Sequence, residues 1–278
     1  MLGERELPEL AAAALRIAHE AAGVARAGFR SRPFVQEKGE HDLVTQFDRA
    51  SEALLVERLG ALTPGVPIVA EEGTGVADEP GRAGPVWYVD PLDGTVNFVH
   101  GHPFWCVSVG LMEGDEPVVG AVVAPELNLH WVGFRARTPG SSGEAQRGQA
   151  RCAVSATTEI GRAMIATGFP TQRDRAPDNN FASFEAVKRR ARAVRRCGSA
   201  AIDLCMVADG TYDGYWERKL HVWDVAAGAA IVRAAGGTIT ALDGGAPRWH
   251  VGHLVASNGH LHAELLRVLA ASRASTIG

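Results

Sequence analysis

The sequence predicts an α+β protein, because segments with helical spacing and segments typical of strands both occur, and three of the strands follow one another directly. Apolar residues recur at helical spacing over residues 8–28. Between residues 105 and 134, three apolar segments are separated only by short turn sequences, which predicts an antiparallel meander. These segments are 105–112, 117–123 and 129–134. The length of 278 residues allows one domain or two closely packed halves.

The composition is that of an ordinary soluble globular protein, with 46% hydrophobic and 22% charged residues. A net charge of −4 gives no reason to expect nucleic acid or an anionic membrane as the main partner. Arg16, His19 and Glu20 interrupt the alanine-rich N-terminal run, which therefore predicts neither a signal peptide nor a transmembrane span. The four cysteines show no Cys-x-x-Cys spacing, which favours free thiols over a zinc site. We therefore expect a cytoplasmic protein.

The segment after the first helix places an acid at the start of a second helix. Residues 34–38 predict an extended segment, and Asp42-Leu43-Val44-Thr45 leads into a helix that continues to residue 62. Asp48 falls in the first turn of this helix. Helix capping alone would explain an aspartate there.

Two adjacent acids follow the next predicted strand. Residues 66–70 predict a short strand, and Glu71 and Glu72 come directly after it. Because neighbouring carboxylates repel each other, the pair either lies in solvent or faces a cation. Residues 73–85 are rich in Gly, Ala, Asp and Pro, which predicts a loop and a candidate lid.

A third strand ends in a group of oxygen-bearing residues. Residues 86–89 predict a buried strand, which Pro91 should end because proline has no N–H for the sheet ladder. Gly94 then allows a sharp turn. The oxygen donors beyond this strand are Asp90, Asp93, Thr95 and the freed backbone carbonyls. Such hard ligands suit Mg²⁺, Mn²⁺ or Ca²⁺ rather than zinc or copper, although an ordinary Asp-Gly turn would share this sequence.

The second half of the chain predicts further strands and helices. Residues 138–149 predict a loop and the boundary between an N-terminal half, 1–148, and a C-terminal half, 149–278. The predicted strands are 152–155, 164–167, 212–216, 238–242 and 254–257. The predicted helices are 177–192, 200–208 (capped by Ser199), 225–235 and 261–270. The basic run 188–196 has no interleaved aromatic residues, which favours a solvated helix face or a subunit contact over nucleic-acid binding.

Seven acids each lie where an apolar strand ends or a helix begins, which is where open sheets place their sites. These acids are Asp48, Glu71, Glu72, Asp90, Asp93, Glu217 and Asp224. Two divalent ions need roughly four or five anionic ligands, so Glu71, Asp90, Asp93 and Asp224 would suffice. Phosphate-ester hydrolysis by a metal-activated water is the chemistry that such a cluster serves best.

Several of these segments together resemble the inositol monophosphatase family. The matching segments are Asp90–Phe98, Trp223–Gly228 with Ala234–Gly237, Asp42–Thr45 with Asp48, Glu71-Glu72 and Gly198–Ala201. They occur in the family's order and spacing over residues 8–270. The resemblance implies a five-layered αβαβα sandwich that forms a homodimer. It also implies hydrolysis of a small-molecule phosphate ester that depends on two or three Mg²⁺ ions, with Mn²⁺ as a possible substitute, and inhibition by Li⁺.

The resemblance also implies a role for each matching residue. The implied metal ligands are Glu71, Asp90 and the Leu92 carbonyl for one ion, and Asp90, Asp93 and Asp224 for another. The implied catalytic residues are Glu71, Thr95 and Asp93, of which Thr95 and Glu71 would orient the attacking water. The implied substrate contacts are the Gly94 and Thr95 N–H groups on the phosphate and Ala200, Glu217 and Asp224 on the remainder. Lys38, Asp48 and Glu72 would be charged groups next to the metals.

The sequence departs from the family pattern at positions that bear on the substrate. Lys219 replaces a glycine in the run Glu217-Arg218-Lys219-Leu220, and Leu129 replaces a common glutamate. We expect myo-inositol monophosphate as substrate. Histidinol phosphate, fructose 1,6-bisphosphate and 3′-phosphoadenosine 5′-phosphate are the alternatives. A hypothesis of another class is a non-catalytic protein whose run 188–196 contacts RNA or another protein.

Overall fold

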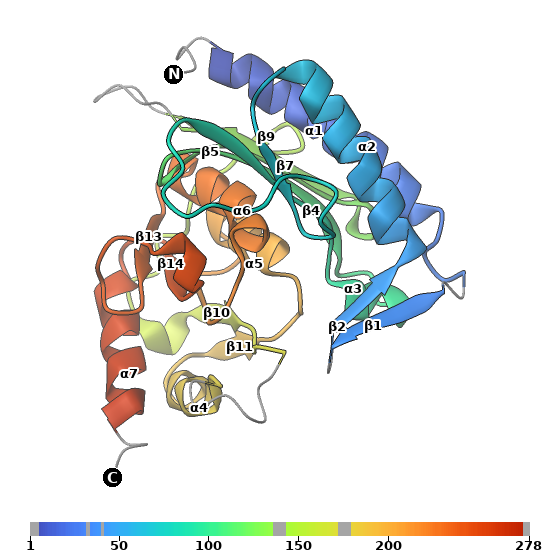
Figure 1. Ribbon diagram of the computed structural model, residues 1–278. Coiled ribbons are helices and arrows are strands. Elements are labelled where there is room, and N and C mark those ends of the chain that lie inside the picture. The colour runs from blue at the N-terminus through green and yellow to red at the C-terminus, as the bar shows by residue number, and fades with distance from the viewer. Residues whose placement is uncertain (1–5, 32–33, 40–41, 136–142, 172–178, 275–278) are drawn as a thin grey trace.

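The protein folds into five layers, which the computed structural model shows for residues 6–31, 34–39, 42–135, 143–171 and 179–274 (Figure 1). A pair of helices covers the outer face of a seven-stranded sheet, a second pair lies between this sheet and a five-stranded sheet, and a third pair covers the far face. The three pairs are α1 (Leu7–Arg26) with α2 (Gln46–Leu62), α5 (Ala200–Ala208) with α6 (Val222–Ala234), and α4 (Phe181–Lys188) with α7 (His262–Ala274). This confirms the predicted α+β fold and its αβαβα layering.

The seven-stranded sheet has its strands in chain order, and only its first pair is parallel. Its strands are β3 (Ile68–Ala70), β4 (Pro85–Asp93), β5 (Cys106–Glu113), β6 (Glu116–Ala124), β7 (Leu129–Phe134), β8 (Glu144–Arg147) and β9 (Ala150–Arg151). The predicted meander of β5, β6 and β7 is therefore confirmed. The prediction of a loop over 138–149 is wrong for its described part, because β8 pairs with β7 and extends the sheet.

The five-stranded sheet mixes parallel and antiparallel pairs in the order β11-β10-β12-β14-β13. Its strands are β10 (Met164–Thr167), β11 (Ala193–Arg195), β12 (Gly214–Glu217), β13 (Thr238–Ala241) and β14 (Leu254–Ser257). Two predictions were wrong here. Residues 152–155 form no strand, and the predicted helix 177–192 is only α4 in the described residues, because the chain turns after Lys188 to pair with β10.

Shorter elements connect these layers. A two-stranded sheet of β1 (Val35–Gly39) and β2 (Asp42–Thr45) leads into α2, and α3 (Thr95–Val99) follows β4. The 3₁₀ turns are η2 (Pro125–Leu127), η3 (Ile160–Arg162) and η4 (Trp249–Val251). Within the described residues, no helix is both long enough and apolar enough to cross a membrane.

A row of glycines brings α6 close to the seven-stranded sheet. Gly110, Gly120 and Gly133 lie side by side on β5, β6 and β7. A Cβ atom at Gly120 would lie 2.1 Å from the Ala227 carbonyl oxygen, so only glycine permits this approach. Because α6 also carries Asp224 in its first turn, the glycine row determines how far that carboxylate lies from the strands.

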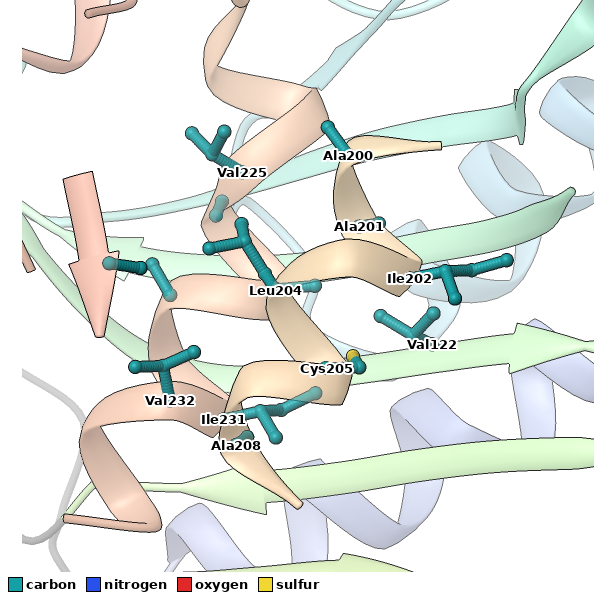
Figure 2. Packing of buried hydrophobic residues seen from close by; sticks show 14 of the residues in the cluster. Val122, Ala200, Ala201, Ile202, Leu204, Cys205, Ala208, Val225, Ile231 and Val232 are labelled. Atoms are coloured by element: carbon teal, nitrogen blue, oxygen red, sulfur yellow. The ribbon is translucent and has the colours of Figure 1, made fainter. Parts of the chain in front are cut away.

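The α5 and α6 helices pack tightly against each other in the middle layer (Figure 2). Leu204 of α5 fits over Gly228 of α6, where a Cβ atom would lie 2.6 Å from that of Leu204. Ile202 and Cys205 also belong to this buried cluster. All four cysteines of the chain are free thiols, as predicted. The close packing sets the position of the N-terminal ends of both helices, which meet at the site described below.

Candidate active site

One pocket gathers nine of the residues predicted for the site. They come from the ends of β3, β4 and β12 and from the starts of α3, α5 and α6. The nine residues are Glu71, Asp90, Leu92, Asp93, Gly94, Thr95, Ala200, Glu217 and Asp224. The tertiary structure thus brings together side chains that lie far apart in the sequence, although their individual roles stay predictions.

An irregularity in β4 directs both of its aspartates toward this pocket. Asp90 pairs with Ser108 of β5 and Asp93 pairs with Cys106, so three steps on β4 face two steps on β5. This is the geometry of a β-bulge, which redirects side chains near functional sites. The prediction that Pro91 ends the strand is wrong, because β4 continues through it to Asp93. The bulge accommodates the proline and leaves Asp90 free to accept the Leu92 N–H at 2.8 Å.

Asp93 ties β4 to the start of α5. Its Oδ2 accepts a hydrogen bond from the Ser199 hydroxyl at 2.7 Å and another from the Ala201 N–H at 2.8 Å. The predicted cap is confirmed, because the same Ser199 hydroxyl accepts the Ile202 N–H at 3.4 Å. The carboxylate therefore lies at a helix N-terminus, where backbone donors and the helix dipole stabilise negative charge.

The turn between β4 and α3 depends on glycine at position 94. Gly94 has φ of +99°, and a Cβ atom there would lie 3.0 Å from the Phe104 carbonyl oxygen. The hydroxyl of the next residue, Thr95, lies within hydrogen-bond distance of two acceptors. These are the Leu92 carbonyl oxygen at 3.1 Å and the Asp48 Oδ1 at 3.2 Å. Both acceptors hold the hydroxyl beside the pocket.

Asp224 and Glu217 enter the pocket from the C-terminal half. Asp224 lies in the first turn of α6 and accepts the His221 N–H at 2.7 Å. Glu217, at the end of β12, accepts a hydrogen bond from the Tyr215 hydroxyl. Gly168 makes room for this carboxylate, since a Cβ atom there would lie 2.0 Å from Oε1 of Glu217.

Burial raises the pKa of four carboxyls in this pocket, those of Asp90, Asp93, Glu217 and Asp224. Burial, together with the neighbouring Glu71, Asp93 and Asp224, raises the pKa of Asp90 well above its usual range. Burial, partly offset by hydrogen bonds from Ser199 and α5, raises the pKa of Asp93 to about 6. Burial and the charges of Asp93 and Glu71 raise the pKa of Asp224. The carboxylates of this cluster therefore repel one another when ionised, and a bound cation would offset that repulsion.

The donor chemistry of this cluster fits a hard divalent ion. Five carboxylates line the pocket together with Leu92, and oxygen ligands of this kind are those that Mg²⁺ and Mn²⁺ take. In the ranges that the structure describes, no three His, Cys, Asp or Glu side chains are already grouped as a metal-binding set.

The three charged residues predicted next to the metals lie in different settings. Asp48 is buried at the N-terminus of α2, and burial raises its pKa despite hydrogen bonds from Thr45 and Thr95. Its predicted place in the first turn is confirmed. Glu72 follows Glu71, and its N–H donates to Glu52 of α2. Lys38 lies on β1, and its side chain is outside the described part of the structure.

Sequence reasoning missed several residues that contact the pocket or support it. Arg196, Ser199, Gly168 and Phe169 also line it. The position of Arg196, two residues before Gly198-Ser199, is the available signal, but the basic run by itself favours a solvated helix face or a subunit contact. Lys219 has φ of +58°, so the lysine keeps the left-handed conformation that a glycine would adopt.

Comparison with known proteins agrees with this geometry. The sequence profile of the inositol monophosphatase family matches residues 6–274. The chain belongs to the inositol monophosphatase family. Membership of this family, together with its named relatives, identifies the protein as a phosphatase, an enzyme that hydrolyses phosphate esters.

Individual relatives of the inositol monophosphatase family cover most of the chain. An inositol-1-monophosphatase of Synechocystis is 43% identical over 244 residues, which are 86% of this chain and 80% of that protein. The Nus factor SuhB of Haemophilus influenzae is 36% identical over 91% of this chain and 92% of its own. The structure of an inositol monophosphatase from Anabaena superposes with a TM-score of 0.84 at 34% identity, covering 96% of this chain and 97% of that one.

Proposed function

We propose that this phosphatase hydrolyses myo-inositol monophosphate to inositol and phosphate in a reaction that depends on Mg²⁺. The observation that carries the proposal is the pocket itself, in which carboxylates from both halves of the chain face the start of α3. The named activity of the Synechocystis relative supports the choice of substrate. Histidinol phosphate, fructose 1,6-bisphosphate and 3′-phosphoadenosine 5′-phosphate are the alternative substrates.

The carboxylates divide between two ions in this proposal. Glu71, Asp90 and the Leu92 carbonyl would hold one Mg²⁺, while Asp90, Asp93 and Asp224 would hold another, with Mn²⁺ as a substitute. Bound ions of this kind lower the pKa of water and neutralise the charge on the leaving oxygen. Glu71 and the Thr95 hydroxyl would orient the attacking water, since Thr95 is already held by Asp48 and the Leu92 carbonyl.

Backbone donors and the C-terminal half would bind the substrate. The N–H groups of Gly94 and Thr95 would receive the phosphate. Ala200, Glu217 and Asp224 would contact the hydroxyls of the cyclitol. Burial raises the pKa of Glu217 to about 7, so near neutral pH this carboxyl can accept or donate a hydrogen bond to a hydroxyl.

Phosphate release is the direct test. The enzyme would be given myo-inositol 1-phosphate and, separately, each of the three alternative esters, with Mg²⁺, with EDTA and with added Li⁺. We expect release that requires Mg²⁺, is inhibited by Li⁺ and is fastest with inositol phosphate. Faster release from another ester would reassign the substrate, and release in EDTA would contradict the metal mechanism. We also propose that the protein forms a homodimer and that it is located in the cytoplasm.

A second candidate function is suggested by the relative named Nus factor SuhB. Arg189, Arg190 and Arg192 are exposed beside β11, where they would be accessible to RNA. We consider nucleic-acid binding the weaker proposal, because it would leave the crowded carboxylates without a role. A gel shift that weakens with salt and is lost when the three arginines are replaced by glutamine would support it. No shift at low salt would exclude it.

A further inference from the structure

One face of α2 carries three buried polar side chains, each bonded to a different part of the active site. Asp48, Ser51 and Glu52 lie at helical spacing on this face and are between 0% and 1% exposed. Asp48 accepts the Thr95 hydroxyl at 3.2 Å, and Ser51 donates to the Pro91 carbonyl at 3.0 Å. These two contacts hold the segment that follows Asp90. Glu52 contacts the other metal-binding segment.

Glu52 holds the turn that directly follows Glu71. Its Oε2 accepts the Glu72 N–H at 2.6 Å, and its Oε1 accepts the Thr74 N–H at 2.8 Å. A buried carboxylate is costly unless its oxygens are hydrogen-bonded, and backbone N–H groups bonded to an ionised acceptor are held strongly. The Glu71 N–H donates in turn to the Val89 carbonyl at 3.3 Å, so both sides of Glu71 are fixed.

We propose that Glu52 is a positioning residue for Glu71 and that it sets the separation between the two metal-binding segments. The inference rests on the proposed function, in which Glu71 is a metal ligand. Glu52 does not line the pocket and acts only through the backbone of Glu72 and Thr74. Because Ser51 and Asp48 hold the Asp90–Thr95 segment from the same helix, α2 connects the two segments rigidly.

The substitution Glu52→Gln tests this role with little change in volume. The amide has one acceptor oxygen, so one of the two backbone N–H groups would face the NH₂ group instead. In metal-free protein titrated with Mn²⁺, followed by the electron paramagnetic resonance of the free ion, we expect roughly tenfold weaker binding. We also expect faster hydrogen exchange at the Glu72 and Thr74 amides. The matched control is Glu57→Gln, an exposed glutamate of the same helix, which should change neither readout.

The variant Glu71→Gln in the same titration separates the two proposals. If Glu71→Gln binds Mn²⁺ as the parent does, Glu71 is not a metal ligand and the proposed function is wrong at that point. If Glu71→Gln binds weakly while Glu52→Gln stays within twofold of the parent, the positioning role is overturned. Should Glu52→Gln fail to fold, Glu52→Asp takes its place, because it keeps the charge but is too short to reach both N–H groups; the same criteria apply.

Discussion

At the scale of single residues, the proposed active site contains buried polar groups, and burying such groups is unfavourable unless each has a hydrogen-bond partner. Asp93 lies beside Ser199 and the N-terminus of α5, and Glu52 receives two backbone donors. Each partner supplies hydrogen bonds that replace those lost to water. The residues proposed for the site are thus distinguished by their hydrogen-bond partners as well as by their own chemistry.

The substitution Asp93→Asn should reduce turnover at least about a hundredfold while leaving the fold intact, because it removes an anionic metal ligand of the proposed site. Phosphate release in excess Mg²⁺ measures the effect, and circular dichroism checks the fold. The control is Asp115→Asn, at an exposed hairpin turn, which should behave like the parent. Full activity of Asp93→Asn would rule out the two-ion arrangement.

His262 should make the protein less stable in mild acid. Its ring lies between the Ser257 hydroxyl at 2.9 Å and the Thr240 hydroxyl at 2.8 Å, and burial lowers its pKa below 6.5. As the pH falls through 6.5, the unfolded chain therefore takes up a proton before the folded one does, and the contribution to stability is lost. Urea unfolding at pH 7.5 and 5.5 should show a smaller loss for His262→Gln than for the parent. Equal losses would contradict this assignment.

At the scale of elements, close packing of helices on strands places the site residues. The glycine row of Gly110, Gly120 and Gly133 lets α6 approach the sheet, and Gly228 lets α5 approach α6. These contacts leave no space for a side chain, so the helix start that carries Asp224 is fixed by backbone contact. The bulge in β4 likewise fixes the directions of the Asp90 and Asp93 side chains.

The substitution Gly120→Ala should destabilise the protein by about 1–3 kcal/mol, because its methyl group would overlap the Ala227 carbonyl and push α6 outward. Denaturant unfolding measures the loss, and Mn²⁺ binding should weaken with it as Asp224 moves. Gly23→Ala is the control, since it lies in α1 with no atom within 4 Å of the new methyl group. That change should be neutral or stabilise the helix by up to about 1 kcal/mol. A fully stable Gly120→Ala protein would show that the contact is not restrictive.

At the scale of the whole molecule, the site lies where the layers meet. Asp90 and Asp93 lie on the seven-stranded sheet, and Glu71 directly follows its strand β3. Asp224 belongs to the middle helices and Glu217 to the five-stranded sheet. An ion held by ligands from separate layers binds the folded protein and not the unfolded chain. Without it, the crowded carboxylates repel one another across the same boundary.

Mg²⁺ should therefore raise the unfolding free energy, by about 2.7 kcal/mol at a hundred times the dissociation constant. Thermal unfolding with increasing Mg²⁺, and again after EDTA, measures the gain and its reversal. The gain should shrink in Asp224→Asn, because that ligand joins α6 to the strands. A melting temperature that ignores Mg²⁺ at every concentration would contradict the proposed site.

Much of this architecture was predictable from local patterns. The meander, the helix that begins near Asp48 and the acids at element ends follow from apolar spacing, caps and turn residues. Errors occurred where partners override local preference. β4 continues past Pro91 because a bulge accommodates the proline, and β8 and β11 form because neighbouring strands supply hydrogen bonds.

The sequence by itself determined which residues are proposed for the chemistry, because strand ends, proline, glycine and acidic side chains form patterns within a few residues of one another. It also determined the family, through motifs that recur in order along the chain. Only the tertiary structure decided that Asp224 and Glu217 meet Asp93 in one pocket, and that Glu52 holds the turn after Glu71. These relations depend on packing between distant segments, where Gly120 lies against the backbone of α6 and Gly168 against the Glu217 carboxylate.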